Sequence, residues 1–321
     1  MSGGGEGVLA IDAGNSKTDV VLVAPDGAVV GRARGGGFRP QLIGARAAVD
    51  DLQPLVEEAT GGVQVVAHVS ACLANVDLAP EHDLLREEIE QHGWARTTYV
   101  GNDTFALLRA GVERPPGVAV VCGAGINCSG IGHDGRTAGF AAVGRISGDW
   151  GGGAFLVEEA MWWAARAVDG RGRQTTLARL LPEHFGRSGM GDLIEAVHLG
   201  DISERRLHNA TPVLFEAAHG GDEVATSVVL RQAEEIVALA VSVMRRLDLL
   251  EERTDVVLGG GVLTAGHALL LDAIAAGLAA QAPLAVPVVV TAPPVVGAAL
   301  LGLDAIGAPP AAHARLRGSF A

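Results

Sequence analysis

Cysteine is scarce in this sequence, and the few that occur are not arranged for cross-linking or metal binding. The chain has three, Cys72, Cys122 and Cys128, which are too few for a disulfide framework. Their spacing does not match that of clustered metal ligands either. Such usage is typical of a reducing compartment, and we expect a cytoplasmic protein.

The sequence also lacks an uninterrupted apolar segment of the length that a membrane span requires. The alanine-rich stretch over residues 273–290 is broken by Gln281, Pro283 and Pro287, whereas a span needs about 20 consecutive apolar residues. No basic region opens the chain, so a signal peptide is not expected. These absences predict a protein without a membrane partner.

Positively charged residues are fewer than negatively charged ones. Lys and Arg number 24 against 37 Asp and Glu, which gives a formal net charge of −13. Such a chain repels the phosphate backbone of nucleic acids and anionic lipid surfaces. We therefore exclude nucleic acid as a partner and expect a small-molecule substrate, for which a positive charge would be tolerated.

Glycine, in contrast, is abundant, but its 45 occurrences follow no strict period and cluster in short turns. A chain of 321 residues, 49% of them hydrophobic, is long enough for roughly two domains with their own cores. Predicted strands alternate with predicted helices, which indicates an α/β protein. We expect strands within 8–30 (a hairpin), 63–72, 97–100, 118–122, 128–131, 255–258 and 286–290, and helices over 45–60, 82–92, 104–110, 154–168, 224–250, 265–278 and 297–303.

The second half of the chain opens in the same way as the first. Residues 114–117, Arg-Pro-Pro-Gly, interrupt the pattern, and we place a domain boundary there. The first half begins with a strand, a glycine turn and a strand, and residues 118–131 repeat this arrangement. We interpret this as an internal repeat of topology rather than of sequence, and expect two similar lobes.

The turn that joins the first two predicted strands is rich in groups that bind phosphate. One apolar run ends in Asp12, the sequence Ala-Gly-Asn-Ser-Lys-Thr follows, and a second apolar run resumes at Val20. An ordinary hairpin with a polar tip would show the same pattern. However, backbone N–H groups and hydroxyls beside a carboxylate suit phosphate oxygens and Mg²⁺.

Two further glycine turns, over residues 123–127 and 259–261, also follow apolar strands. None of the three turns has the Gly-Lys-Ser/Thr ending of a P-loop, and none has the Gly-x-Gly-x-x-Gly of a dinucleotide-binding fold. We therefore expect phosphate to be held between opposed turns, one on each lobe. Such a site needs a hinge, and closure of the hinge would exclude water.

Four segments in order carry a resemblance to a known family. Asp12–Asp19 resembles a first phosphate motif, Gly123–Cys128 a second, Leu258–Val262 an adenosine motif, and Val296–Gly302 a closing helix. The chain resembles the sugar kinase/Hsp70/actin superfamily and, within it, the N-acetylglucosamine kinase and BadF/BadG-type ATPase group.

The resemblance covers nearly the whole chain and implies an α/β, two-lobed actin-like (ribonuclease H-like) ATPase fold with an interlobe cleft. The N-terminal lobe would comprise residues 1–116, joined by a C-terminal helix over 295–306, and the C-terminal lobe residues 117–294.

ATP and Mg²⁺ are the cofactors that the resemblance implies. Asp12 would lie at the metal and the transferred phosphate. Lys17 would touch a phosphate, although an exposed turn lysine is often only solvated. The residues implied to bind the nucleotide are Gly14, Asn15, Ser16, Lys17, Thr18, Gly123, Ala124, Gly125, Gly259, Gly260 and Gly261.

Asp103 is the candidate catalytic residue. It stands between a predicted strand and a predicted helix, where an acid can simply be the helix N-cap. The resemblance implies that it also contacts the sugar and is the general base that accepts the proton of a sugar hydroxyl. Phosphoryl transfer requires positioning and charge stabilisation more than covalent chemistry, so one carboxylate is sufficient.

The other candidate sugar-binding residues are Asn127, Asp149, Trp150 and His133. The family has Gly-Asp-Glu-Gly-Ser where this chain has Gly-Asp-Trp-Gly-Gly, and its acid contacts sugar hydroxyls; Asp149 can alternatively be a cap. Trp150 either lines the sugar pocket or fills the core between turn and helix. Asn127 is also a common turn residue, and His133 is a candidate because its predicted hairpin lies close to the sugar loops.

The identity of the sugar depends on one departure from the family. N-acetylglucosamine kinases carry an Asn in a Ser-Thr-Asn-His segment after the first hairpin, and here the sequence is Gly-Gly-Gly-Phe-Arg-Pro-Gln over residues 35–41. A free amino group would suit carboxylates such as Asp149 and Asp103, whereas Arg39 in the pocket would oppose a cation. We expect phosphorylation of glucosamine to glucosamine 6-phosphate, with N-acetylglucosamine as the alternative.

Two functions of other classes are also considered. Activase-type ATPases of the family bind an iron–sulfur cluster through cysteines at a dimer interface, but the segment after Asp149 begins Gly-Gly-Gly-Ala-Phe. Sugar-sensing repressors add a DNA-binding motif in front of the first phosphate motif, and only seven residues precede Val8. The zinc motif of repressor-type kinases is absent as well. The resemblance also suggests a homodimer.

Overall fold

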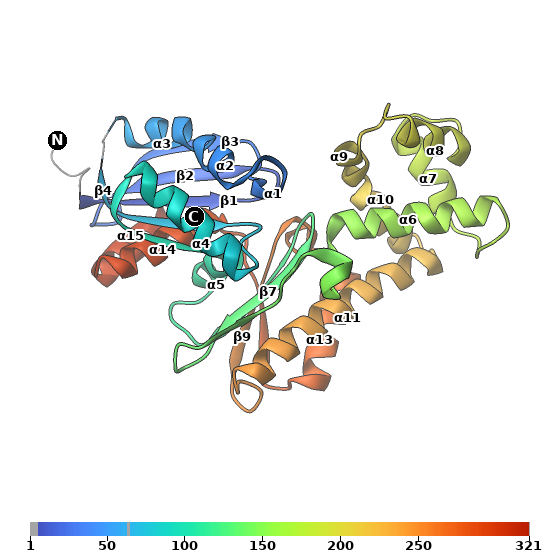
Figure 1. Ribbon diagram of the computed structural model, residues 1–321. Helices are drawn as coiled ribbons and strands as arrows, with labels where there is room; N and C mark the ends of the chain where they lie inside the picture. Colours follow the sequence, from blue (N-terminus) through green and yellow to red (C-terminus); the bar gives the residue numbers. More distant parts are fainter. Residues whose placement is uncertain (1–5, 63–64, 321) are drawn as a thin grey trace.

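Each half of the molecule is built on a five-stranded sheet (Figure 1). The computed structural model describes residues 6–62 and 65–320. The strand order is β3-β2-β1-β4-β5 in the first sheet and β10-β9-β6-β7-β8 in the second. The strands are β1 (Val8–Ala13), β2 (Thr18–Val23), β3 (Val29–Gly35), β4 (Val66–Leu73), β5 (Ala95–Asn102), β6 (Gly117–Cys122), β7 (Ile126–Ile131), β8 (Thr137–Gly139), β9 (Thr254–Gly259) and β10 (Ala285–Val289).

The two sheets share one topology. In the first, β1 pairs antiparallel with β2 and parallel with β4. In the second, β6 pairs antiparallel with β7 and parallel with β9. The predicted internal repeat of topology is therefore confirmed. Both β1 and β6 are central strands, and their continuous apolar sequences are buried between layers of helices.

The helices follow the predicted positions except in the following places. The predicted helix 45–60 is divided after Asp50, and the predicted helix 265–278 is preceded by a separate short helix. Several short helices between residues 177 and 219, and the helices over 40–43 and 310–318, were not predicted. The α-helices are α1 (Pro40–Ile43), α2 (Ala45–Asp50), α3 (Gln53–Thr60), α4 (Ala79–His92), α5 (Asp103–Gly111), α6 (Gly152–Val168), α7 (Leu177–His184), α8 (Met190–His198), α9 (Glu204–Leu207), α10 (Thr211–His219), α11 (Glu223–Arg246), α12 (Gly261–Thr264), α13 (Ala268–Gln281), α14 (Pro294–Ala305) and α15 (Pro310–Gly318).

Helices cover both faces of the first sheet. One face packs on α2, α3 and α4, around Leu85 and Ile89. The other face packs on α14 and α15, through residues such as Leu300 and Leu316. The last long helix, α14, thus returns from the end of the chain to lie against β1 and β4. The predicted strand over 63–72 begins at Val66 in the structure, and residues 63–64 lie outside the described part.

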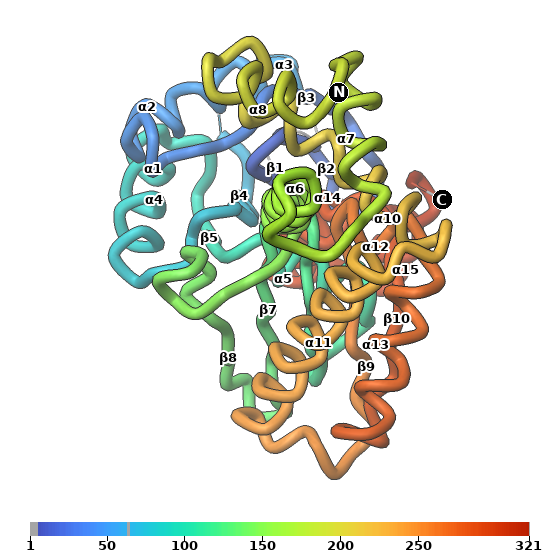
Figure 2. The backbone as a smooth tube through the Cα atoms, turned by 90° about the vertical axis from the view of Figure 1, so that its right-hand side faces the viewer, coloured from blue at the N-terminus to red at the C-terminus, as the bar shows by residue number. Residues whose placement is uncertain are grey.

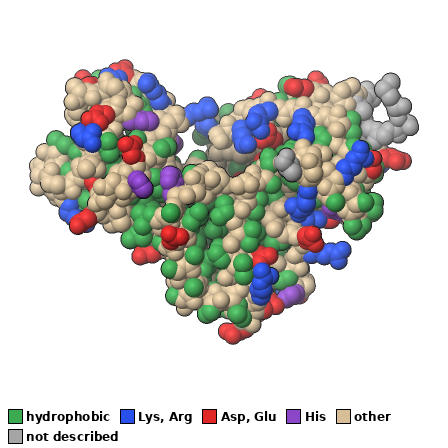
Figure 3. Space-filling view, turned by 180° about the vertical axis from the view of Figure 1, so that it is seen from behind, with side chains coloured by type: hydrophobic (Ala, Val, Ile, Leu, Met, Phe, Trp, Pro, Cys, Tyr) green, Lys and Arg blue, Asp and Glu red, His purple; other side chains and the backbone are tan. Residues whose placement is uncertain are grey.

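The second lobe carries the larger core. Helices α11 and α13 lie side by side on its sheet (Figure 2), and their apolar side chains join those of β6, β7 and β9. The segment α6–α10 forms a helical insert beyond the sheet. Seen from behind, the surface is hollowed between this insert and the first lobe (Figure 3). Within residues 6–62 and 65–320, no helix has the length and apolar character needed to cross a bilayer.

Helix α5 is the element that joins the two lobes. Its residues Leu107 and Leu108 pack against Ala119 and Val257 of the second sheet, while another face contacts α14. At Gly297 the two helices approach so closely that an added Cβ would lie 1.7 Å from the carbonyl oxygen of Ala106. Only a residue without a side chain fits there.

We expect Gly297→Ala to lower the free energy of unfolding by about 1–3 kcal/mol, because α5 and α14 must separate to accept the methyl group. Urea denaturation followed by circular dichroism measures the change. Gly191→Ala is the matched control, since a Cβ at this position in α8 meets nothing within 4 Å. The control is expected to be neutral or stabilising by a few tenths of a kcal/mol. Equal stability of the two variants would contradict the close helix contact.

Candidate functional site

The three glycine turns meet at a cleft between the lobes with a volume of about 250 Å³. The first turn contributes Asn15 and Ser16 to its wall. The second contributes residues 123–127, and the third contributes Gly260 and Gly261. Asp103 lines the same cleft from the start of α5. The structure therefore brings together the turns that the sequence separates by more than a hundred residues.

The second turn is held in place by backbone contacts with the start of α6. Gly152 has a φ of +85°, and a Cβ there would lie 2.4 Å from the carbonyl carbon of Gly125. The N–H of Gly153 donates to the carbonyl of Gly123 at 2.8 Å. This close approach keeps side chains away from the cleft and leaves backbone groups at its wall, as phosphate binding requires.

The first turn is held in place by residues 35–41, the segment whose sequence departs from the family pattern. Phe38 is buried, and its N–H donates to the carbonyl of Gly14 at 2.9 Å. Arg39 donates through Nε to the carbonyl of Asn15 at 3.1 Å. Arg39 thus contacts the turn backbone and is not among the described residues that line the cleft.

Asp103 is the first residue of α5, but its neighbour caps the helix. Asn102 accepts hydrogen bonds through Oδ1 from the N–H of Thr104 at 3.0 Å and from its hydroxyl at 2.7 Å. Asn102 is therefore the N-cap of α5, and Asp103 does not have this alternative role. Burial raises the pKa of Asp103 to about 6, although the N–H groups of Thr104 and of Asp103 itself favour the ionised form.

Asp12 lies on β1 at the start of the first turn, and only 7% of its surface is exposed. Burial raises its pKa to about 8, and the negative charges of Asp103 and Asp19 add to the increase, while Lys17 opposes it. A divalent cation would relieve this accumulation of buried negative charge, and carboxylate oxygens are the ligands that Mg²⁺ prefers. The residues present therefore fit a magnesium ion.

Lys17 is the only lysine of the sequence. Its ammonium lies 3.1 Å from Oδ2 of Asp19, and about half of its side chain is exposed. Thr18 is buried and pairs with Ala13 in the sheet. Of the first turn, Asn15 and Ser16 line the cleft, whereas Gly14, Lys17 and Thr18 are not among its lining residues.

A polar network that the sequence did not reveal crosses the cleft. Oδ1 of Asp77 accepts hydrogen bonds from Nδ2 of Asn102 at 2.8 Å and from Nδ2 of Asn127 at 3.0 Å. Burial raises the pKa of Asp77 to about 7, with further increases from Asp103 and Glu81. The network connects the first lobe to Asn127, which lies on β7 of the second.

Asn75 also lines the cleft from the same loop. It has a φ of +63°, and its Nδ2 donates to Oδ1 of Asn15 and to the carbonyl of Phe38. Asparagine adopts this left-handed conformation more readily than most residues, and the two hydrogen bonds hold its amide at the wall of the cleft. One signal could have revealed residues 75–77, because polar groups that follow a buried parallel strand gather where ligands bind in α/β proteins.

The remaining predicted residues lie elsewhere. Asp149 is half-buried and accepts a hydrogen bond from the hydroxyl of Ser147, and it does not line the cleft. Trp150 is buried in the core of the second lobe, where the guanidinium of Arg231 stacks 4.0 Å from the ring centroid. Of its two predicted roles, this position favours core packing. Gly259 is also buried, against Leu107.

The structure does not bring His133 to the cleft. Its side chain is exposed in the turn between β7 and β8, and Nε2 lies 2.8 Å from Oε2 of Glu252. Asn127 stands at the opposite end of β7, and an extended strand separates its ends by about 3.3 Å per residue. The prediction failed because proximity in sequence to the sugar loops does not ensure proximity in space.

The arrangement supplies the parts that phosphoryl transfer requires. Backbone N–H groups of opposed turns can hold phosphate oxygens, the carboxylate of Asp12 suits a cation, and Asp103 offers an acceptor for a proton. Asn and Asp side chains on both lobes offer hydrogen bonds to a polar substrate.

The chain is similar in sequence to two proteins that are named as sugar kinases. It is 26% identical over 260 residues to the N-acetylmuramic acid/N-acetylglucosamine kinase of Clostridium acetobutylicum, across 80% of this chain and 85% of that one. It is 25% identical over 311 residues to the N-acetyl-D-glucosamine kinase of Dictyostelium discoideum, across 92% of this chain and 97% of that one.

A solved structure confirms the predicted fold. It belongs to a protein of Chromobacterium violaceum described as a candidate N-acetylglucosamine kinase, and the two chains superpose with a TM-score of 0.72 at 22% identity. The match covers 94% of this chain and 99% of that one. The molecule therefore has the two-lobed actin-like ATPase fold.

A family model matches most of the sequence. That model describes the BadF/BadG/BcrA/BcrD ATPase family, and it matches residues 9–302, from β1 to α14. The chain belongs to the BadF/BadG/BcrA/BcrD ATPase family.

Proposed function

We propose that the protein is an ATP-dependent kinase that phosphorylates the 6-hydroxyl of N-acetylglucosamine. The observation that carries the proposal is the position of Asp103. It begins the helix between the two lobes, its neighbour Asn102 caps that helix, and it faces the opposed glycine turns. A carboxylate so placed can accept a proton where a phosphoryl group is transferred.

In the proposed reaction Asp103 accepts the proton of the sugar hydroxyl while the hydroxyl oxygen bonds to the γ-phosphorus of ATP. The bond from that phosphorus to the bridging oxygen breaks, and ADP leaves. The turns at Asn15–Ser16 and 123–125 would bind the phosphates through backbone N–H groups. Gly260 and Gly261 would lie against the adenosine, where the absence of side chains leaves room.

Asp12 would hold the magnesium ion, because its buried carboxylate lies among like charges and has no hydrogen-bonding cation of its own in the described structure. Mg²⁺ bound there would neutralise negative charge on the transferred and leaving phosphates. Lys17 would add a second positive charge at the edge of the same turn, and Asp19 keeps its ammonium close by.

The choice of sugar follows the relatives rather than our first expectation. The sequence favoured free glucosamine, but both relatives are named for N-acetylated sugars. Arg39 donates to the backbone of the turn, and its guanidinium is not at the described wall of the cleft, where it would repel a cationic sugar. The family's Asn is absent from residues 35–41 of this chain. Asn75 is hydrogen-bonded to Phe38 of that segment and lines the cleft, so it would supply a side-chain amide nearby.

The activase alternative requires cysteines that can reach a cluster between subunits. Cys72, Cys122 and Cys128 are all buried inside the lobes. Burial raises the pKa of the Cys122 thiol to about 12, which disfavours the thiolate that binds iron. These observations favour the kinase.

The first prediction concerns the base. Asp103→Asn is expected to lower kcat by about 10²–10⁴-fold with little change in the affinity for the sugar, because the amide cannot accept the proton. Coupled ADP release gives kcat, and calorimetry gives the affinity. Asp83→Asn, the same change on the exposed surface of α4, is the control and should leave both unchanged. Turnover by Asp103→Asn at the wild-type rate would exclude Asp103 as the base.

The second prediction follows from the pKa of about 6 at Asp103. The ionised carboxylate is the active form, so kcat/KM for the sugar is expected to rise about tenfold per pH unit below pH 6 and to level off above it. The rising limb should be missing from the residual activity of Asp103→Asn. A wild-type profile that is flat from pH 5 to pH 8 would contradict this assignment.

The third prediction concerns the substrate. ADP release with Mg-ATP is compared for N-acetylglucosamine, glucosamine, glucose and no sugar, and the acetylated sugar is expected to give the highest kcat/KM. A higher value for glucosamine would return the proposal to the free amino sugar. Equal ADP release with and without sugar would reject the kinase and support a different ATPase.

A further inference from the structure

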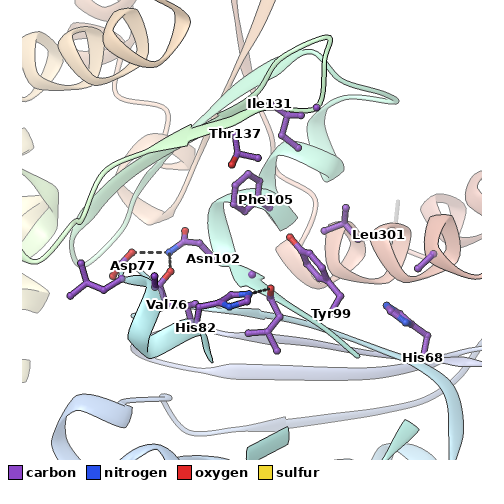
Figure 4. A pocket seen from close by; sticks show the side chains of 16 residues that line it. His68, Val76, Asp77, His82, Tyr99, Asn102, Phe105, Ile131, Thr137 and Leu301 are labelled. Carbon is purple, nitrogen blue, oxygen red and sulfur yellow. Dashed lines mark hydrogen bonds between the residues drawn. The ribbon is translucent and has the colours of Figure 1, made fainter. Parts of the chain in front are cut away.

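A second and larger hollow lies at the edge of the first sheet. It has a volume of about 570 Å³, within the range of small-molecule sites. Its walls come from β5, the start of α4 and the end of α14 on the first lobe, and from the β7–β8 hairpin on the second (Figure 4). We call this hollow the edge crevice. The proposed kinase reaction makes no use of it.

One end of the edge crevice holds an unsatisfied hydrogen-bond acceptor. His68 is only 6% exposed, it lines the crevice, and its Nε2 has no partner within the described residues. The hydroxyl of Thr97 lies 3.2 Å from the carbonyl of Ala67 and 2.8 Å from Nδ1 of His68. In the tautomer in which this hydroxyl donates to the carbonyl, Nδ1 donates to the hydroxyl and Nε2 keeps a lone pair. Burial lowers the pKa of His68, which keeps the ring neutral.

The other end of the crevice is acidic. Asp77 lines it, and one of its carboxylate oxygens is occupied by Asn102 and Asn127. The carboxylate of Glu81 is close enough to raise the pKa of Asp77. The described residues that line the crevice include no Lys or Arg. This charge distribution favours a cationic group of the ligand at this end of the crevice.

Between its two ends the crevice is mainly apolar. The rings of Tyr99 and Phe105 and the side chain of Leu301 point into it (Figure 4). It follows β5 from the level of His68, which pairs with Thr97, to Asn102. Five residues of strand extend about 16 Å. A hydrogen bond of about 3 Å at each end leaves room for a ligand about 10 Å long.

We propose that the edge crevice is a binding site for an elongated aromatic amine. A donor at one end of the ligand, such as a phenol or an indole N–H, would bond to Nε2 of His68. The aromatic body would pack between Tyr99, Phe105 and Leu301. An ammonium group at the other end would pair with Asp77. The ligand would contact both lobes, and it would share Asp77 and Asn102 with the cleft.

The test uses a pair of probes with one body and opposite charges. The aminomethyl derivative of para-hydroxybiphenyl has a phenol at one end and an ammonium at the other. The carboxylate derivative differs only in the charged end. Calorimetry with the full-length protein at pH 8, where Asp77 is ionised, is expected to show saturable binding of the amine and at least tenfold weaker binding of the carboxylate. Nitrogen NMR of labelled histidine should show a shift at the His68 Nε2.

Two variants locate the binding. Ala305→Trp places a large ring at the exposed end of α14 that lines the crevice, and it is expected to weaken the amine at least tenfold. Ala314→Trp, on the exposed face of α15 and outside the crevice, is the matched control and should bind as the wild type does. Neither residue belongs to the cleft. Urea denaturation of both variants checks that the tryptophan leaves the fold intact.

A competition experiment with an ATP analogue, which would occupy the cleft, distinguishes the edge crevice from the nucleotide site. Binding of the amine is expected to persist with a saturating non-hydrolysable ATP analogue. Loss of binding under that condition, equal binding of the two probes, or full affinity in Ala305→Trp would each overturn the proposal. So would the absence of saturable binding to the wild type. None of these outcomes depends on turnover, so the kinase proposal stands or fails separately.

Discussion

The arrangement of the site depends on the contact between α5 and α14. Helix α5 touches both sheets, and α14 can lie against it only because Gly297 has no side chain to meet the carbonyl of Ala106. This contact fixes the direction of α5 relative to β1, and the first residue of α5 is Asp103. The same helix packs on the second sheet through Leu107 and Leu108. The candidate base is thus positioned by the element on which the two lobes meet.

The electrostatics of the cleft oppose folding in the absence of a ligand. Asp12, Asp77 and Asp103 all have raised pKa values, and burial is the first cause in each case. Carboxylates that hold protons in the folded state stabilise it below their unfolded pKa, and this contribution is lost as the pH rises through the folded values. Near neutral pH the protein therefore retains destabilising charge in its cleft. A bound cation would remove this repulsion between the buried carboxylates.

The sequence predicted those parts of the site that belong to backbone turns. A glycine turn after a buried strand specifies its own conformation, so the three turns and their meeting across two lobes could be inferred before the structure. The roles of single side chains could not. Asn102 and Asp103 are both suitable caps, and only the structure shows that Asn102 accepts the capping hydrogen bond. Asp77 was missed because it carries no motif, and His133 was misplaced because strand direction takes it away from the cleft. The helices over 177–219 were missed because they are short and lack a long apolar period.

The polar contacts between the lobes lie at the same ends of the strands as the site. The hydroxyl of Ser129 on β7 donates to the hydroxyl of Thr104 on α5 at 2.8 Å, since the Thr104 proton is already donated to Asn102, and Asn127 of the same strand donates to Asp77. Both bonds join the first lobe to one strand of the second, close to Asp103. An opening of the cleft that keeps these two bonds would change the distance between the opposed turns at Asn15 and Ala124 more than the position of Asp103 relative to Asn127.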